Sequence, residues 1–183
     1  MAERMQRIAE QSASAGNLVS ARKAFLRAAT YFSASAIFID GTRDQSRGVP
    51  AWKRHQICWE RFCSCMKSAA EKVGIPYEGT LMPGYFFHPD KTGDPLATII
   101  FNNGSDGSTS GMWTCGIAAA MERGYAALAF DGPGQNSMLW LQNIPFRHDW
   151  EKVITPLVDF LLKRKDVDPY RIVLSGISQG GYW

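Results

Sequence analysis

The sequence predicts an α/β protein in which a helical N-terminal domain precedes a mostly parallel β-sheet. Apolar residues recur every three or four positions over the first 75 residues, which is the spacing of amphipathic helices. From Tyr77 onward, short apolar runs with strand character alternate with helical patterns, as they do when helices connect the strands of a parallel sheet. We therefore expect a helical domain over residues 1–75 and a sheet domain over residues 76–183.

The helical domain contains two long amphipathic patterns. The first begins after Asn17, a residue type that caps helix N-termini well, and Gly16 separates it from the preceding segment. Its apolar stripe is Leu18, Ala21, Phe25, Ala28, Ala29, Phe32 and Ala36. The second pattern runs from about Ala51 to Val73, and Gly74 and Pro76 are expected to end it.

The sheet domain is expected to begin with two short antiparallel strands, residues 77–82 and 85–88, divided by Pro83-Gly84. The segments that follow alternate in type. They are strand 97–102, loop 103–110, helix 111–123, strand 125–130, loop 131–143, helix 148–165 and strand 171–175. Helix 148–165 has a wide apolar stripe, so we expect it to pack on the sheet.

Composition and charge are those of a folded globular chain. The 183 residues are 45% hydrophobic and carry a net charge of +3. The basic run Lys163-Arg164-Lys165 closes a helical pattern, where cations suit the negative end of the helix dipole, so we expect no nucleic-acid partner. Residues 1–11 carry four charged side chains and no apolar core of a signal peptide, and no run approaches the roughly 18 apolar residues of a membrane span. We expect a cytoplasmic protein without a membrane partner.

The four cysteines are Cys58, Cys63, Cys65 and Cys115, and their spacing matches neither a zinc or redox motif nor a disulfide framework. Cys58 and Cys65 share a helical stripe with Phe62 and Ala69. We therefore expect them to be small buried hydrophobic residues and not ligands.

Residues Gly176-Ile177-Ser178-Gln179-Gly180 form a G-x-S-x-G motif directly behind an apolar run. In a nucleophile elbow, a serine sits on a strained strand-to-helix turn. The backbone two residues to either side then comes so close that a Cβ there would clash, which explains both glycines. A plain turn or a helix cap can show the same letters, but the preceding strand favours a catalytic serine.

A serine hydroxyl is a weak nucleophile at neutral pH, so Ser178 needs a base and needs donors for the oxyanion that forms on a carbonyl substrate. One donor is expected to be the backbone N–H of Gln179, just after the nucleophile. The other should come from the loop 102–108 after the strand that ends near Phe101, because its glycines allow close backbone approach.

Four segments together resemble the α/β hydrolases, in particular a branch with an N-terminal helical domain. That branch includes 2,6-dihydroxypseudooxynicotine hydrolase, fungal pigment-pathway hydrolases that shorten polyketides, and relatives labelled acylaminoacyl-peptidase-like. The segments are Leu81–Tyr85, Asn103–Ser108, Asp131–Gln135 and Gly176–Tyr182. The resemblance spans about the whole chain, with its specific motifs from residue 81 on. It implies that the chain supplies the first half of a hydrolase sheet and stops just after the elbow.

The resemblance also implies site residues. It assigns the second oxyanion N–H to Ser105, with Asp106 as a near alternative, although Asn103 stands where the family commonly has histidine. In the family the acid and the histidine of the triad follow the serine, so both are expected beyond residue 183. We accordingly expect His55, His88 and His148 to have core or surface roles, and Asp131 to be a turn residue.

The expected activity is a serine hydrolase that forms an acyl-enzyme, without metal or organic cofactor, on a small-molecule carbonyl substrate. An ester, an amide as in an acyl-peptidase, and the C–C bond of a β-dicarbonyl or polyketide-like compound all stay open, as does a homodimer. Two rivals remain: a non-catalytic chain that retains the scaffold, and a phosphate or nucleotide binder using residues 104–108. The second is weaker because no G-K-[ST] or G-x-G-x-x-G pattern follows.

Overall fold

The computed structural model describes residues 1–66, 69–89 and 93–183, without the side chains of Asp40 and Ala69. The chain divides into two compact units, Met1–Lys67 and Ser68–Trp183. This division lies earlier in the chain than the boundary we expect at residue 75. Each unit has its own core and is described by itself.

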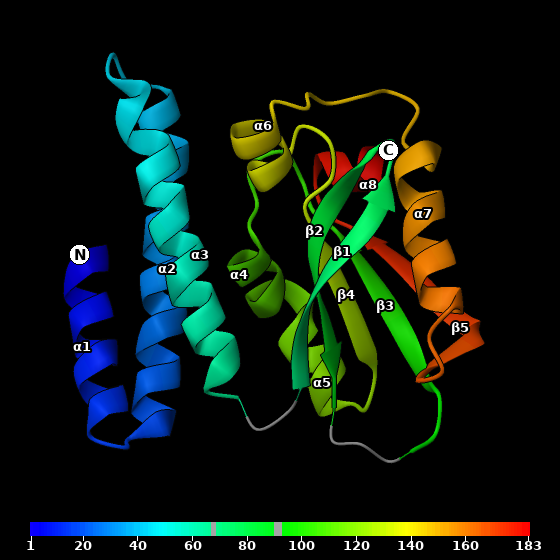
Figure 1. Cartoon of the computed structure of the whole chain (residues 1–183), viewed down its shortest axis with the longest axis horizontal. Coiled ribbons are helices and arrows are strands. Elements are labelled where there is room, and N and C mark those ends of the chain that lie inside the picture. Colours follow the sequence, from blue (N-terminus) through cyan, green and yellow to red (C-terminus); the bar gives the residue numbers. More distant parts are fainter. Residues whose placement is uncertain (67–68, 90–92) are drawn as a thin grey trace. The chain divides into compact units, whose positions relative to one another are not determined.

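The first unit is helical. Its elements are α1 (Ala2–Ser14), α2 (Leu18–Asp40), the 3-10 turn η1 (Gln45–Arg47) and α3 (Gly48–Ser64) (Figure 1). Gly16, with a φ of +76°, lies between α1 and α2, as expected of a glycine that interrupts a helical pattern. Asn17 makes no capping hydrogen bond through its side chain, so the predicted capping contact is absent. The α2 stripe is buried from Ala21 to Ala36, but Leu18 is 56% exposed.

Residues 65–66 and 69–73 are not helical, which corrects the predicted second helix. Helix α3 ends at Ser64, and strand β1 covers Ala69–Tyr77. Val73, Ile75 and Tyr77 are buried, whereas the residues between them are exposed, which is the period-two pattern of a strand. Gly74 and Pro76 occupy the exposed face of this strand and do not end a helix.

The cysteine prediction is partly confirmed. Cys58 and Phe62 are buried on α3, but Cys65 follows the end of the helix and is only half-buried. Ala69 begins a strand, so the four residues share no helical stripe; its side chain lies outside the described part.

Strand β1 and strand β2 (Thr80–His88) form an antiparallel hairpin. The turn is Glu78-Gly79, both with positive φ (38° and 82°), as in the tight turns that match strand twist. The predicted break at Pro83-Gly84 is therefore wrong, because both residues lie within β2. A Cβ on Gly84 would lie 2.8 Å from the carbonyl oxygen of Ala129, so this glycine permits close approach of neighbouring strands.

The second unit is built on a five-stranded mixed sheet. Strands β3 (Leu96–Asn102), β4 (Ala126–Phe130) and β5 (Val167–Gly176) complete it in the order β1-β2-β4-β3-β5 (Figure 1). Strand β4 is antiparallel to β2, and β3 is parallel to both β4 and β5. The predicted strands 97–102 and 125–130 are confirmed, and β5 begins earlier than the predicted residue 171.

Helices cover both faces of this sheet. Helix α7 (Glu151–Leu162) packs Val153, Leu157 and Leu161 into a cluster that contains Phe86 of β2. On the next residue of the same strand, Phe87 contacts Trp113 in the helical segment formed by α4 (Thr109–Met112), the π-helical turn η2 (Trp113–Ile117) and α5 (Ala118–Glu122). Figure 1 shows α7 and this segment on opposite sides of the strands. Parallel strands usually have both faces of the sheet covered by helices, and β4, β3 and β5 form the parallel part of this sheet.

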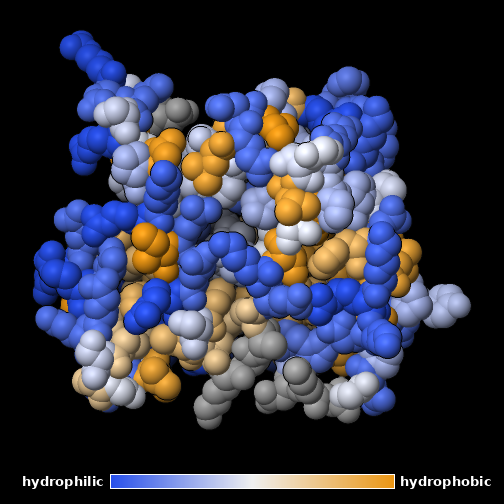
Figure 2. Space-filling model, viewed as in Figure 1, coloured by the Kyte–Doolittle hydropathy of each residue, from blue (hydrophilic) through white to orange (hydrophobic). Residues whose placement is uncertain are grey.

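The visible face of each unit in Figure 2 is largely hydrophilic, with scattered hydrophobic residues. Among the described residues, no helix combines the length and apolar character needed to cross a membrane.

Candidate active site

Ser178 lies at the tip of a strained turn between β5 and the short helix α8 (Gln179–Tyr182). Its φ is 54° and its ψ is −127°, a conformation uncommon for a residue with a Cβ. A Cβ on Gly176 would lie 2.6 Å from Gly181 Cα, and a Cβ on Gly180 would lie 2.3 Å from the Asn103 carbonyl oxygen. The steric explanation that the sequence gives for both glycines is thus confirmed, and the backbone has the geometry of a nucleophile elbow.

The loop after β3 lies directly against this turn. A Cβ on Gly104 would be 3.0 Å from Ser178 Cβ and 3.5 Å from Ser178 Oγ. The two segments are also joined by hydrogen bonds: Ile177 N–H donates to the Asn102 carbonyl (3.1 Å), and Asn102 Nδ2 donates to the Gly180 carbonyl (2.8 Å). Parallel pairing of β3 with β5 brings their carboxyl ends to the same edge of the sheet.

Among the described residues, some backbone N–H groups near Ser178 already have a hydrogen-bond acceptor, and others do not. The Gly104 N–H donates to Asn103 Oδ1 at 2.9 Å. Within the described part of the chain, the N–H groups of Ser105 and Gln179 have no hydrogen-bond acceptor. Ser178 is exposed, and both Ser105 and Gln179 are half-buried. These are the two groups that the sequence predicts for an oxyanion hole, and that role stays a prediction.

The loop after β4 supports the loop after β3 through two buried amide side chains, Gln135 and Asn136. Gln135 Nε2 donates to the carbonyl oxygens of Asn103 (2.6 Å) and Gly104 (3.2 Å). Asn136 Nδ2 donates to the Gly107 carbonyl at 2.6 Å. Sequence reasoning missed both residues.

The predicted loop 131–143 is partly wrong, because it contains helix α6 (Asn136–Gln142). Glutamine and asparagine beside the glycines of Asp131–Gln135 were the signal that could have indicated a structured turn here.

Asp131 is fully buried just after β4. Its carboxylate accepts hydrogen bonds from Asn136 Nδ2 (3.2 Å) and from the Ser137 N–H (3.3 Å), so it ties together the turn that carries Gln135. Burial raises the pKa of Asp131 to about 6, and the hydrogen bonds from Ser137 and Asn136 act in the opposite direction. These contacts agree with the expected role in a turn.

The three histidines have the core or surface roles that the sequence predicts. His55 is buried in the helical unit, where Nδ1 donates to the Ala29 carbonyl (3.0 Å) and the ring stacks on Trp52. His88 Nδ1 is 2.6 Å from the Pro89 carbonyl oxygen, and His148 is exposed. No hydrogen bond among the described residues joins any of them to Ser178. Across the part of the chain that the structure describes, no three His, Cys, Asp or Glu side chains are grouped to hold a metal ion.

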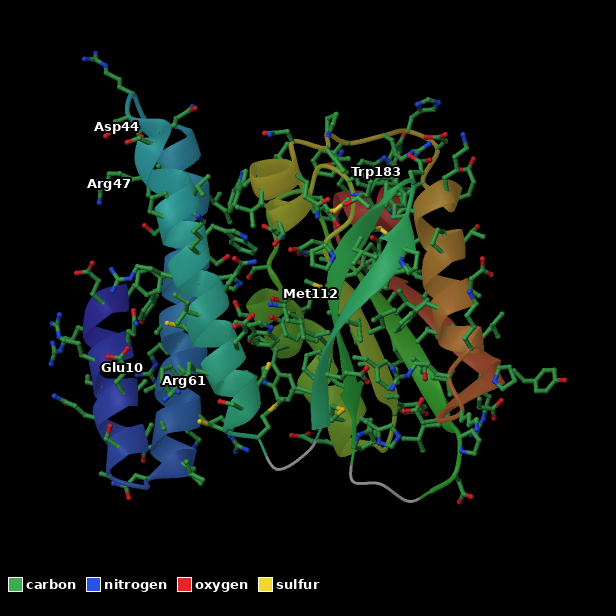
Figure 3. The ribbon with its side chains drawn as sticks, in the orientation of Figure 1. Glu10, Asp44, Arg47, Arg61, Met112 and Trp183 are labelled. Carbon is green, nitrogen blue, oxygen red and sulfur yellow. The ribbon has the colours of Figure 1, made fainter. Side chains whose placement is uncertain are left out.

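Aromatic rings pack beside the elbow helix. Trp183, labelled in Figure 3, stacks on Trp150 with ring centroids 4.2 Å apart. The ring centroid of Phe146 lies 5.0 Å from that of Trp183. Trp150 precedes α7, so this contact links the segment after Ser178 to the helix that covers the sheet.

Comparison with known proteins shows which fold the chain shares. No family model matches the chain. A curated α/β hydrolase from Xenoacremonium sinensis, xenA, is 34% identical across the whole chain. This chain has the α/β-hydrolase fold. A second relative, the 20-hydroxy-prefusarin hydrolase FUS2 of Gibberella moniliformis, is 30% identical over 99% of the chain. The chain spans about half the length of the curated relatives it matches, 45% in both cases.

Solved structures show the same α/β-hydrolase fold. The structure of 2,6-dihydroxy-pseudo-oxynicotine hydrolase matches 98% of this chain with a TM-score of 0.85 and 24% identity, over 49% of its own length. AbyA5 matches 99% of the chain with a TM-score of 0.63 and 16% identity, also over 49% of its length. Both matches extend through the helical unit as well as the sheet.

Proposed function

We propose that the protein is a serine hydrolase in which Ser178 is the nucleophile. The observation that carries the proposal is the strained turn at Ser178, packed against Gly104, with two unused backbone N–H groups in the adjoining segments. An activated serine beside preorganised N–H donors is the arrangement that acyl transfer requires.

In the proposed cycle, Ser178 Oγ attacks the substrate carbonyl carbon while a general base takes its proton. The carbonyl π electrons move to oxygen, and the oxyanion accepts hydrogen bonds from the N–H groups of Ser105 and Gln179. When the C=O bond re-forms, the leaving group departs with the bonding pair and takes the proton from the base. Water then attacks the resulting ester in the same way, which releases the acid and restores Ser178.

The base and its carboxylate partner are proposed to follow the elbow, beyond residue 183. The superfamily order is serine, acid, histidine. Among the described residues, none of His55, His88 and His148 forms a hydrogen bond to Ser178, which supports a base from outside this set.

We propose a small-molecule carbonyl compound as substrate, either an ester or a β-dicarbonyl, polyketide-like compound cleaved at a C–C bond. The support is that two similar proteins are named as hydrolases of 20-hydroxy-prefusarin and of 2,6-dihydroxy-pseudo-oxynicotine. The cycle is common to both bond types and differs in the leaving group, an alkoxide for the ester and a carbanion for the C–C bond.

The proposal is tested on the full-length protein with a fluorophosphonate probe and a p-nitrophenyl ester. Ser178→Ala should abolish labelling and lower kcat by at least about 10⁴-fold, because the nucleophile is lost. The matched control is Ser175→Ala, which removes a half-buried hydroxyl from β5 and should leave labelling unchanged.

Undiminished turnover in Ser178→Ala would contradict the proposal. Absence of labelling in the unmutated, folded protein would favour the rival reading of a scaffold without catalysis.

A further inference from the structure

Gln135 is fully buried between two loops at one edge of the sheet. Its Nε2 donates to the Asn103 and Gly104 carbonyls, at 2.6 and 3.2 Å, and its Oε1 accepts from the Gly132 N–H at 2.8 Å. One side-chain amide therefore uses both its donor and its acceptor to join the loop after β4 to the loop after β3.

The Gly104 carbonyl and the Ser105 N–H belong to one planar peptide group. In a trans peptide these two bonds point in opposite directions, and the structure contains no cis peptide among its described residues. A hydrogen bond that holds the Gly104 oxygen toward Gln135 therefore directs the Ser105 N–H away from Gln135. The preceding peptide group, between Asn103 and Gly104, is held at both ends. Its carbonyl oxygen accepts from Gln135 Nε2, and its N–H donates to Asn103 Oδ1.

Gln135 can hold these groups firmly because its own position is fixed. It is 0% exposed, and its acceptor is occupied by a backbone N–H three residues earlier, which closes the turn 132–135. That turn is closed a second time by the Gln135 N–H, which donates to the Gly132 carbonyl at 2.9 Å. Rotation of the amide would break three hydrogen bonds at once.

We propose that Gln135 is a positioning residue that sets the direction of the Ser105 N–H toward the oxyanion formed at Ser178. The proposal rests on the proposed function for its catalytic consequence. Its structural part, that Gln135 holds the loop 103–107, is independent of which residue is the nucleophile.

The test replaces the amide by a thioether of similar size, Gln135→Met, in the full-length protein. The control is Gln142→Met on α6, because Gln142 makes the same kind of bridge: its Oε1 accepts from Thr80 Oγ1 (2.7 Å) and its Nε2 donates to the Leu81 carbonyl (3.1 Å). A second variant, Gln135→Glu, keeps an acceptor for Gly132 but loses the donor to both carbonyls.

We expect Gln135→Met and Gln135→Glu to lower kcat by about 10- to 100-fold, less than the 10²–10³-fold typical of deleting an oxyanion donor, since the N–H remains but is misdirected. KM should change less than about threefold, and affinity for a boronic acid inhibitor should fall by the same factor as kcat. Amides in residues 103–107 should exchange hydrogen faster. Gln142→Met should stay within twofold of the unmutated protein in all of these.

Values of kcat and boronic acid affinity within twofold in both Gln135 variants would overturn the proposal, as would unchanged amide exchange in residues 103–107. If Gln135→Met does not fold, Gln135→Glu is judged by the same criteria. Failure of the proposed function gives a different result, namely full activity in Ser178→Ala, and the exchange measurement then still decides whether Gln135 holds the loop.

Discussion

Ser178 is surrounded by positions where the backbone leaves no room for a side chain. Gly176 and Gly180 flank it in sequence, and Gly104 approaches it from the loop after β3. A Cβ at any of the three would lie about 3 Å or less from a neighbouring atom. The strained φ of Ser178 is therefore maintained by close backbone packing on several sides, which is how a conformation costing roughly 1–3 kcal/mol can persist.

The raised pKa of Asp131 predicts how the stability of the protein depends on pH. Because burial raises its pKa to about 6, the folded state binds more protons than the unfolded state between pH 4 and 6. The free energy of unfolding should therefore fall as pH rises through this window, by about 3 kcal/mol from this group. Asp131→Asn should abolish that part of the fall, as measured by urea denaturation of both proteins from pH 4 to 7.5. Parallel stability curves for the two proteins would contradict the assigned environment.

The sequence predicted the residues of the elbow better than the residues that support it. Gly176, Ser178 and Gly180 lie within five consecutive residues, so their spacing alone carries the steric argument. Gln135 and Asn136 contact carbonyl groups about thirty positions earlier, and this requires β3 and β4 to lie side by side in register. A local pattern does not contain that information.

At the scale of elements, the β1–β2 hairpin shows why glycine and proline, which often interrupt helices and strands, misled the sequence interpretation. Gly74, Pro76, Pro83 and Gly84 suggest breaks, yet all four lie inside strands. Pro76 is tolerated because β1 is the edge strand, where a missing N–H costs little. Strands β3 and β4 contain no glycine or proline, so they were predicted correctly.

Gly84 allows this register to be tested. Gly84→Ala places a Cβ 2.8 Å from the Ala129 carbonyl oxygen, so β2 and β4 must shift, and we expect a loss of about 1–3 kcal/mol in the free energy of unfolding. The control is Gly41→Ala, whose nearest atom would be 3.8 Å away at a φ of −81°, and which should change stability by less than about 0.5 kcal/mol. Equal effects of the two substitutions, measured by chemical denaturation, would mean that the pairing of β2 with β4 is misassigned.

The whole molecule consists of two units whose buried ionisable groups respond to acid in opposite senses. In the helical unit, burial lowers the pKa of His55 to about 4, with the hydrogen bond to Ala29 acting against it. In the sheet unit, the pKa of Asp131 is raised. Acidification from pH 6.5 to 4 therefore destabilises the first unit and stabilises the second through these groups.

We predict that the helical unit loses about 3 kcal/mol of stability from His55 as pH falls through this range, because the unfolded chain takes up the proton first. Amide exchange, corrected for its intrinsic pH dependence, should show loss of protection in α2 and α3 at pH 4.5 but not in β3 and β4. His55→Asn keeps an N–H donor for Ala29 and has no ionisable ring, so it should remove the effect. Equal loss of protection in the two units would refute the prediction.

The stacked rings of Trp150 and Trp183 give the molecule an optical property of its own. Two indoles with centroids 4.2 Å apart and planes inclined by 21° are close enough for their electronic transitions to couple. One indole adjoins α8, which starts at the residue after Ser178, and the other adjoins α7. A shift of α8 would alter their near-ultraviolet circular dichroism, so a displacement of this helix can be followed without a dye.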